Sequence, residues 1–297
     1  MHTPVLLEQV INALEIKKGG LYIDATFGEG GYSNAILDKG GKVLGIDLDK
    51  NQLTGSPSYA KASEGKRVNE LTSLKLVQGN FGDIEKIAKE NDFFPVDAIV
   101  FDLGLSMKQI SQSGKGFSFK KLNEPLDMRI SDRTEMTAKY LLNHLSEAEL
   151  FDVFAKNSEE INSQKIAREI IIKRQFKKLE TVGDLINCID KAIGEPNNSV
   201  YKRIFQALRI QVNDEFENFK SGLMGAVKII KDDGKIAVVT FHSIEDRIVK
   251  NFSKTGGVRL LNKKPISNRR GRSFEKSAKL RVLIPEVEQV SLQGKSF

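Results

Sequence analysis

A glycine-rich turn and a carboxylate further along the chain form the first group of residues that could bind a cofactor. The turn runs from Asp24 through Gly28 to Gly30 and Gly31, and Asp47 ends the next apolar run. Glycines allow a tight turn and a close approach of the backbone to a ligand. A carboxylate at about this spacing, roughly 20 residues on, can accept hydrogen bonds from both hydroxyls of a ribose. The spacing therefore predicts an adenosine-type site.

The residues around the turn distinguish between two adenosine cofactors. The dinucleotide fingerprint G-x-G-x-x-G would need glycine or alanine at position 33, where this chain has Ser33. Asp24 would repel a pyrophosphate, whereas it suits the sulfonium and amino groups of S-adenosylmethionine. The electrostatics therefore favour the methyl donor over NAD.

Two further apolar runs also end in residues that could line this site. Phe81 lies in Gly-Asn-Phe-Gly (79–82), where its ring could stack on adenine or pack in the core, and Asp102 opens Asp-Leu-Gly-Leu-Ser (102–106). In open α/β sheets, ligands bind outside the carboxyl ends of the strands. We therefore expect Phe81 and Asp102 near Asp24 and Asp47.

The elements that must position these residues alternate between apolar runs and helical patterns. Buried strands are predicted at 21–27, 42–49, 73–79 and 96–104, and again at 235–241 and 278–284. Strands alternating with helices predict a doubly wound parallel sheet, an α/β fold. We expect Gly234 to end the helix before the fifth strand, and the last strand to lie at the sheet edge.

The middle of the chain has a helical periodicity from about 135 to 210, with AELFDVFAKN, SQKIAREIIIKRQF and VGDLINCIDKAI as its clearest segments. We expect a helical domain at 111–210 inserted between a first α/β part at 1–110 and a second part at 211–297. Residues 54–70, rich in glycine, serine and lysine, are expected to form an exposed insertion.

The charge is concentrated near the end of the chain. The net charge is +7, and the segment 250–281 alone holds eleven Lys or Arg against one acid, Glu275, which gives it +10. A basic stripe suggests a polyanionic partner such as RNA, and a solvated, partly disordered tail is the alternative. No apolar run is long enough to span a membrane, and one cysteine among three scattered histidines makes neither a disulfide nor a zinc pattern. We expect a cytoplasmic protein with no metal, whose oligomeric state the sequence leaves open.

Several other side chains could contact a nucleic acid. In the loop 116–129, Phe117 and Phe119 could stack a base and Arg129 could bind a phosphate, although a packed loop with an Asp127–Arg129 contact is favoured. Arg203 and Arg209, on a predicted helix over 201–215, are further candidates for phosphate contacts.

Two motifs bear on the chemistry. FHSIEDR (241–247) leaves a strand and enters a helix, where Ser243 and Asp246 predict a capping box and His242 is a candidate for substrate binding. Cys188 lies in a helical pattern and is expected in a core. Methylation of a pyrimidine carbon 5 would need a cysteine nucleophile, so transfer to nitrogen or oxygen is favoured.

Eight blocks of the sequence resemble one family. HTPVLLEQV, DATFGEGGYS, GIDLD, FDLGLS, GFSF, PLDMR, FQALRIQVN and FHSIEDRIVK occur in order over about residues 2 to 250. They are similar to the signature blocks of the bacterial ribosomal RNA small-subunit methyltransferase H family, also called MraW. The resemblance implies a Rossmann-like class I methyltransferase with an inserted helical substrate-recognition domain. It also implies S-adenosylmethionine-dependent N4-methylation of a cytidine in 16S ribosomal RNA.

The resemblance also assigns residues to the donor site, namely Gly30, Gly31, Tyr32, Asp47, Phe81, Asp102 and Gln109. The family usually has histidine at the position of Tyr32, a contact expected through the backbone. Paired serines of the family are Ser106 and Met107 here, and SAKLRV matches only loosely. The acceptor for the target amino group could be Asp102 or the Leu103 carbonyl. A DNA amino-methyltransferase and a non-catalytic donor-binding assembly factor remain alternatives.

Overall fold

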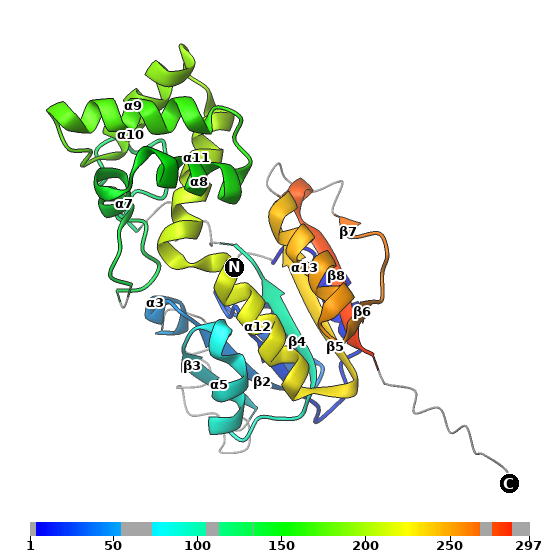
Figure 1. Ribbon diagram of the computed structural model, residues 1–297. Helices are drawn as coiled ribbons and strands as arrows, with labels where there is room; N and C mark the ends of the chain where they lie inside the picture. Colours follow the sequence, from blue (N-terminus) through cyan, green and yellow to red (C-terminus); the bar gives the residue numbers. More distant parts are fainter. Residues whose placement is uncertain (1–3, 55–72, 105–112, 133, 268–274, 287–297) are drawn as a thin grey trace, which may run out of the picture. The chain divides into compact units, whose positions relative to one another are not determined.

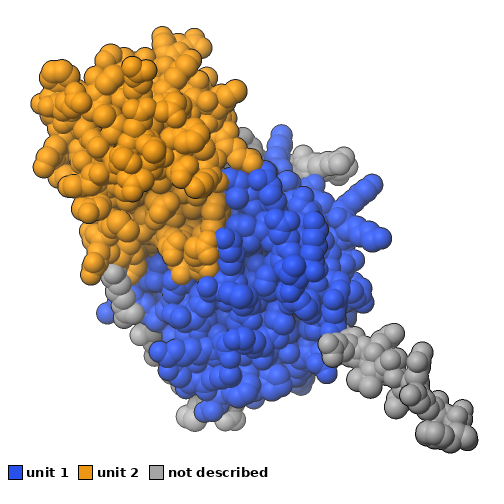
Figure 2. Space-filling model, viewed as in Figure 1, with its two compact units in different colours: residues 1–103, 219–297 blue, residues 104–218 orange. Residues whose placement is uncertain are grey.

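The chain forms two compact units. The computed structural model describes residues 4–54, 73–104, 113–132, 134–267 and 275–286. The α/β unit comprises residues 1–103 and 219–297, and the helical unit comprises residues 104–218 (Figure 2). The predicted insertion at 54–70 falls almost wholly outside the described residues.

The α/β unit is built on one eight-stranded sheet. In spatial order its strands are β3 (Leu74–Gln78), β2 (Lys42–Asp47), β1 (Leu21–Asp24), β4 (Val96–Asp102), β5 (Ile230–Thr240), β8 (Lys279–Pro285) and β6 (Val258–Leu260), and β7 (Ile266–Ser267) also pairs with β8. The first five are parallel, and β8 is antiparallel to its neighbours. This confirms the predicted α/β fold of the Rossmann-like class I type.

Two expectations about the late strands are wrong. β8 lies between β5 and β6 rather than at the sheet edge. Gly234 does not end a helix, because α12 (Glu215–Ile229) stops earlier and Gly234 lies inside β5, where the pairing with β4 shifts register between Val96 and Ala98. An irregularity of this kind is a common place for a strand glycine.

Helices cover both faces of the sheet. On one face, α5 (Ile84–Glu90), α12 and α13 (Ser243–Thr255) bury apolar side chains in one cluster, and these three helices lie in front of the strands in Figure 1. On the other face, α1 (Leu7–Leu14) and α2 (Gly31–Asp38) contribute to a second cluster. The unit also contains α3 (Lys50–Thr54), η1 (Phe81–Asp83) and η2 (Glu275–Ser277). Apolar burial on both faces explains why the parallel strands are nearly continuous apolar runs.

The helical unit has a separate core. Its helices in the described residues are α7 (Ala138–His144), α8 (Glu147–Ser158), α9 (Ser163–Phe176), α10 (Val182–Ile193) and α11 (Asn198–Asn213). The three clearest helical segments of the sequence correspond to α8, α9 and α10. Ser146 and Thr181 each form a capping box at a helix start, which satisfies backbone donors that the helix leaves unpaired. Of the helices in the described residues, none combines the length and apolar character needed to cross a bilayer.

Candidate methyl-donor site

Three aspartates lie at the carboxyl ends of neighbouring strands. Asp24 ends β1, Asp47 ends β2 and Asp102 ends β4. The chain runs from β1 outward to β2 and β3, and then returns to place β4 on the other side of β1. The topological switch point therefore lies between β1 and β4, where open α/β sheets bind their ligands. Asp24 and Asp102 flank that point.

Burial raises the pKa of all three carboxyls. The pKa of Asp24, which is fully buried, rises to about 6, chiefly because its ionised form is desolvated. Burial likewise raises the pKa of Asp47 to about 6. The pKa of Asp102 rises to about 7 through burial and then through repulsion from Asp24 and Glu245. A cation beside these three buried carboxyls would stabilise their ionised forms.

Two carboxylate oxygens of this cluster are buried without a hydrogen-bond partner among the described residues, Asp24 Oδ1 and Asp102 Oδ1. The other oxygen of Asp24 accepts a hydrogen bond from Ser33 Oγ at 2.7 Å. Buried acceptors are normally satisfied, so these two indicate a missing ligand with positive charge or donor groups. The sulfonium and ammonium groups of S-adenosylmethionine fit that description, whereas a pyrophosphate does not.

Asp47 also fixes the glycine-rich turn. Its Oδ2 accepts from the Gly28 N–H and its Oδ1 from the Asp49 N–H, each at 2.8 Å. Gly28 and Gly30 have φ values of 52° and 75°, the left-handed region that favours glycine. Each carboxylate oxygen has a second lone pair. Asp47 can therefore bind ribose hydroxyls while it holds the turn.

Gly31 and Tyr32 contact the start of the chain. A Cβ at Gly31 would lie 2.1 Å from Pro4 Cγ, so the missing side chain makes room for the N-terminal segment. Tyr32 is buried, and its hydroxyl donates to the Val5 carbonyl at 2.5 Å. A donor contact through the Tyr32 backbone stays a prediction, and Pro4 and Val5 of the block HTPVLLEQV acquire a structural role.

Phe81 is partly buried and packs against the core. It lies in η1, and its ring meets Phe101 edge to face with the centroids 5.8 Å apart. Asn80 accepts from the Gly82 N–H at 2.8 Å and fixes the loop. The core-packing interpretation is confirmed, and adenine stacking on the exposed part stays a prediction. Gln109 lies outside the described residues.

The capping box of α13 is displaced by one residue from its predicted position. His242 is the N-cap, and Glu245 rather than Asp246 completes the box. Glu245 is buried, its Oε2 accepts from the Phe241 N–H at 2.7 Å, and its Oε1 lies 2.7 Å from His242 Nε2. The His242 ring therefore has a structural function at this helix start, and its role in substrate binding stays a prediction.

Asp246 instead holds two basic residues of the segment 250–281. Arg281 is buried, and its Nε donates to Asp246 Oδ1 at 2.5 Å, while Lys250 Nζ lies 3.2 Å from Asp246 Oδ2. The described part of the segment is folded into α13, β6, β7 and β8, so the alternative of a partly disordered tail is wrong there, and Arg281 is no exposed phosphate contact. Arg269, Arg270 and Arg272 lie outside the described residues.

The arginines proposed for RNA in the helical unit are engaged in ion pairs. Arg129 binds Asp127 with two parallel hydrogen bonds of 2.8 and 2.9 Å. Arg209 binds Glu215 in the same bidentate way, at 2.8 and 2.9 Å. Arg203 Nε donates to Glu160 Oε2 at 2.5 Å. A phosphate would have to compete with these carboxylates, so phosphate binding by Arg129 and Arg209 stays a prediction without geometric support.

Two apolar predictions concern the core of the helical unit. Phe117 and Phe119 pack against that core, and the Phe119 ring lies 5.7 Å from the Tyr201 ring. Cys188 is buried in the same core, and burial raises the pKa of its thiol to about 11. The packed loop and the core cysteine are therefore confirmed. A thiol with that pKa is a poor nucleophile.

Sequence inspection missed two contributors to the site. Thr26 Oγ1 accepts from the Asp102 N–H at 2.8 Å and so joins the ends of β1 and β4. Glu245 places a buried carboxylate whose charge raises the Asp102 pKa. Both contacts join residues far apart in the sequence, so only the tertiary structure reveals them. Within the described residues, no group of three or more His, Cys, Asp or Glu side chains could hold a metal ion.

The fold and the acid cluster define an S-adenosylmethionine-dependent methyltransferase. The family model described as the MraW methylase family matches residues 1–283, and the chain belongs to that family. It is 41% identical to a Ribosomal RNA small subunit methyltransferase H of Dictyoglomus thermophilum, over 95% of this chain and 96% of the relative. A protein of the same name from Clostridium botulinum (strain Loch Maree) is 37% identical over 95% and 97% of the two chains. One from Bacteroides fragilis is 39% identical over 86% and 82%.

Proposed function

We propose that this protein methylates N4 of a cytidine in 16S ribosomal RNA of the small ribosomal subunit, in the cytoplasm. Two buried carboxylate oxygens at the switch point of the sheet, Asp24 Oδ1 and Asp102 Oδ1, carry the proposal, because they need a cationic or donor-bearing ligand. The names of the relatives point to ribosomal RNA of the small subunit, and N4 of a cytidine comes from the family resemblance.

Different residues of the α/β unit would bind different parts of the donor. S-adenosylmethionine supplies an electrophilic methyl group on its sulfonium. Asp47 would bind the ribose, the backbone of Gly30 to Tyr32 would form the turn beside the donor, and Phe81 would contact the adenine. Gln109 belongs to the donor site through the family resemblance alone.

Asp102 is our candidate for the group that faces the target amino nitrogen. The lone pair of a cytosine N4 is delocalised into the ring, so an acceptor for one of its protons favours the tetrahedral geometry that attacks a methyl group. Asp102 has a buried, unsatisfied acceptor, Oδ1, among the described residues. The target base must leave any stack to reach it. Positioning of two bound reactants supplies much of the acceleration.

The test is methyl transfer to small ribosomal subunits purified from cells that lack this protein. Labelled methyl should appear at N4 of one cytidine of 16S RNA, located by mass mapping of nuclease fragments. Asp102→Asn, which keeps the side-chain shape, should lose most transfer. Labelling of duplex DNA instead would identify a DNA methyltransferase. Donor binding with no transfer to any small-subunit RNA would identify an assembly factor.

A further inference from the structure

The outward face of α9 combines an aromatic ring with basic side chains. The helix buries Ser163, Ile166, Ala167 and Ile170 in the core of the helical unit. Its opposite face exposes Lys165, Arg168, Ile172 and Phe176, of which Phe176 is 85% exposed. An exposed phenylalanine at a helix end contributes nothing to the core, so it is available to a partner.

The charge of α9 and of the two residues that follow it is strongly positive. From 163 to 178 there are six Lys or Arg and one acid, Glu169, and Glu169 already pairs with Lys191 of α10. In the described part of the chain, no acid forms an ion pair with any of Lys165, Arg168, Lys173 or Lys178. These cations are therefore free to meet an external anion.

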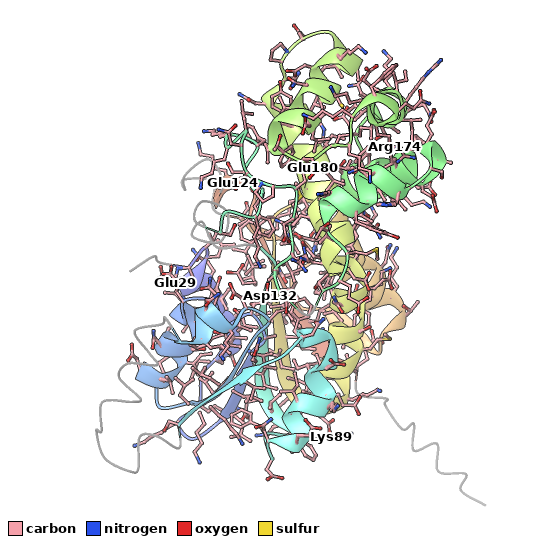
Figure 3. All side chains as sticks on the ribbon, turned by 90° about the vertical axis from the view of Figure 1, so that its left-hand side faces the viewer. Glu29, Lys89, Glu124, Asp132, Arg174 and Glu180 are labelled. Carbon is pink, nitrogen blue, oxygen red and sulfur yellow. The ribbon has the colours of Figure 1, made fainter. Side chains whose placement is uncertain are left out.

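Local structural roles explain only some of these cations. Arg174 points into its own unit, where Nη1 donates to the carbonyls of Leu142 and Leu145 at 2.9 and 2.7 Å (Figure 3). Lys173 lies in the last turn, where it also stabilises the negative end of the helix dipole. Neither reason applies to Lys165 and Arg168, which lie in the first half of the helix.

A second exposed aromatic group lies on the helix that α9 adjoins. Tyr140 of α7 is 47% exposed and stacks on His144 with the ring centroids 4.3 Å apart. Asn143 of the same helix forms two hydrogen bonds with the backbone of Leu179, at 2.9 and 3.0 Å, so α7 is fastened to the segment that follows α9. Exposed rings therefore occur on both helices.

We propose that the outward face of α9 binds a single-stranded segment of the RNA substrate, with one base stacked on Phe176 and phosphates at Lys165, Arg168, Lys173 and Lys178. The proposal rests on the proposed function for the identity of the polyanion. Aromatic rings interleaved with cations are the general solution for binding single strands, because every base has a face that can stack. A paired base inside a duplex offers no such face to a helix surface.

The test measures binding of a fluorescently labelled, mixed-sequence single-stranded RNA oligonucleotide to the full-length protein. Phe176→Ala should weaken binding by roughly five- to 150-fold, the equivalent of one lost base stack, whereas Phe176→Tyr should bind as wild type does. Ile161→Ala is the matched control, because Ile161 is a 91% exposed apolar residue of the same unit. It should leave the affinity unchanged.

Charge is tested by a second variant, Lys165→Gln with Arg168→Gln and Lys173→Gln. This triple variant should reduce the slope of log affinity against log salt concentration by up to about two units. Each phosphate contact with a single strand contributes about 0.7 to that slope. The control removes three exposed lysines of the α/β unit, Lys39, Lys42 and Lys86, and should keep most of the slope.

Separate readouts distinguish this inference from the proposed function. Equal RNA affinity for Phe176→Ala and Ile161→Ala overturns the inference, as does wild-type affinity in Phe176→Leu, which keeps an apolar side chain but no ring. Equal competition by a fully paired RNA duplex overturns the single-strand preference. Failure of the wild-type protein to methylate small subunits would refute the proposed function alone, because these RNA-binding measurements do not depend on turnover.

Discussion

The side chain of Asn213 holds the backbone around Ile130. Asn213 Oδ1 accepts from the Ile130 N–H, and Nδ2 donates to the carbonyls of Met128 and Arg209, all at 2.8 Å. Asn213 ends α11 in the block FQALRIQVN, and Met128 belongs to the block PLDMR. One buried amide therefore joins two motifs that are far apart in the sequence.

We expect Asn213→Ala to lower the free energy of unfolding by about 1–3 kcal/mol, because it leaves the partly buried Ile130 N–H and the buried Met128 carbonyl without partners. Chemical denaturation measures this. Asn218→Ala is the control, since Asn218 Nδ2 makes a single bond of 3.0 Å to the Asn213 carbonyl. An equal and small loss in both variants would contradict the anchoring role.

Asp47→Ala should weaken S-adenosylmethionine binding by about 1.5–3 kcal/mol, the scale of a lost charge-assisted hydrogen bond. The substitution also releases the Gly28 N–H that Asp47 holds. Calorimetry measures the affinity, and Asp38→Ala, which removes an exposed acid, controls for net charge. Unchanged affinity in Asp47→Ala would remove Asp47 from the site.

Donor binding should strengthen as pH rises through about 6 to 7 and then level off. The pKa values of Asp24 and Asp47 are raised to about 6 and that of Asp102 to about 7, so protons occupy these sites at lower pH. A cationic donor favours the ionised carboxyls, and binding releases protons in that range. Calorimetry in two buffers of different ionisation heat counts the protons. Proton uptake, or affinity that falls with rising pH, would contradict the electrostatic argument.

The same raised pKa values affect stability in the opposite direction. Between about pH 4 and 7 the folded protein binds more protons at these carboxyls than the unfolded chain does, so their contribution to stability falls as pH rises. Asp102→Asn should therefore reduce this fall in the donor-free protein. Thermal unfolding at several pH values gives the comparison.

Gly31→Ala should destabilise the protein by about 1–3 kcal/mol, because the new Cβ collides with the Pro4 ring. Pro4→Ala removes the colliding Cγ and Cδ, so the double variant should recover most of the loss. A double-mutant cycle measures the coupling. Additive effects would show that the two residues do not meet.

Cys188→Ser should keep methyl transfer and lose some stability. The thiol is buried in the core of the helical unit, and its pKa is raised to about 11, so it supplies no thiolate near neutral pH. Turnover per folded protein is the measurement. A well-folded but inactive Cys188→Ser protein would restore a covalent carbon-5 mechanism.

Local sequence patterns predicted the parts of the fold that depend on local burial. Buried strands ending at Asp24, Asp47 and Asp102 appear as apolar runs with an acid at the end, because both faces of a parallel sheet are covered. The three helices α8, α9 and α10 appear as clear periodic segments. The position of the donor site can be predicted from these strand ends, because parallel strands bring their carboxyl ends to one edge of the sheet.

Long-range pairing could not be predicted in the same way. β6 has three residues and β7 two, too short for a periodic pattern, so the sequence pattern places β8 at the edge that β6 occupies. Counting charge over 250–281 could not show that Arg281 is buried against Asp246. Residue preferences at helix starts favour Ser243 over His242 as the cap, and only the backbone geometry reverses that order.

The position of the helical unit within the chain has a consequence for synthesis on the ribosome. β4 is made before the helical unit, and its partner β5 is made after it, so one edge of β4 stays unpaired while residues 104–218 emerge. The helical unit is continuous in sequence and has its own core, so its folding need not wait for β5. The sheet, and with it the Asp102 end of the donor site, is completed only when the last quarter of the chain has been translated.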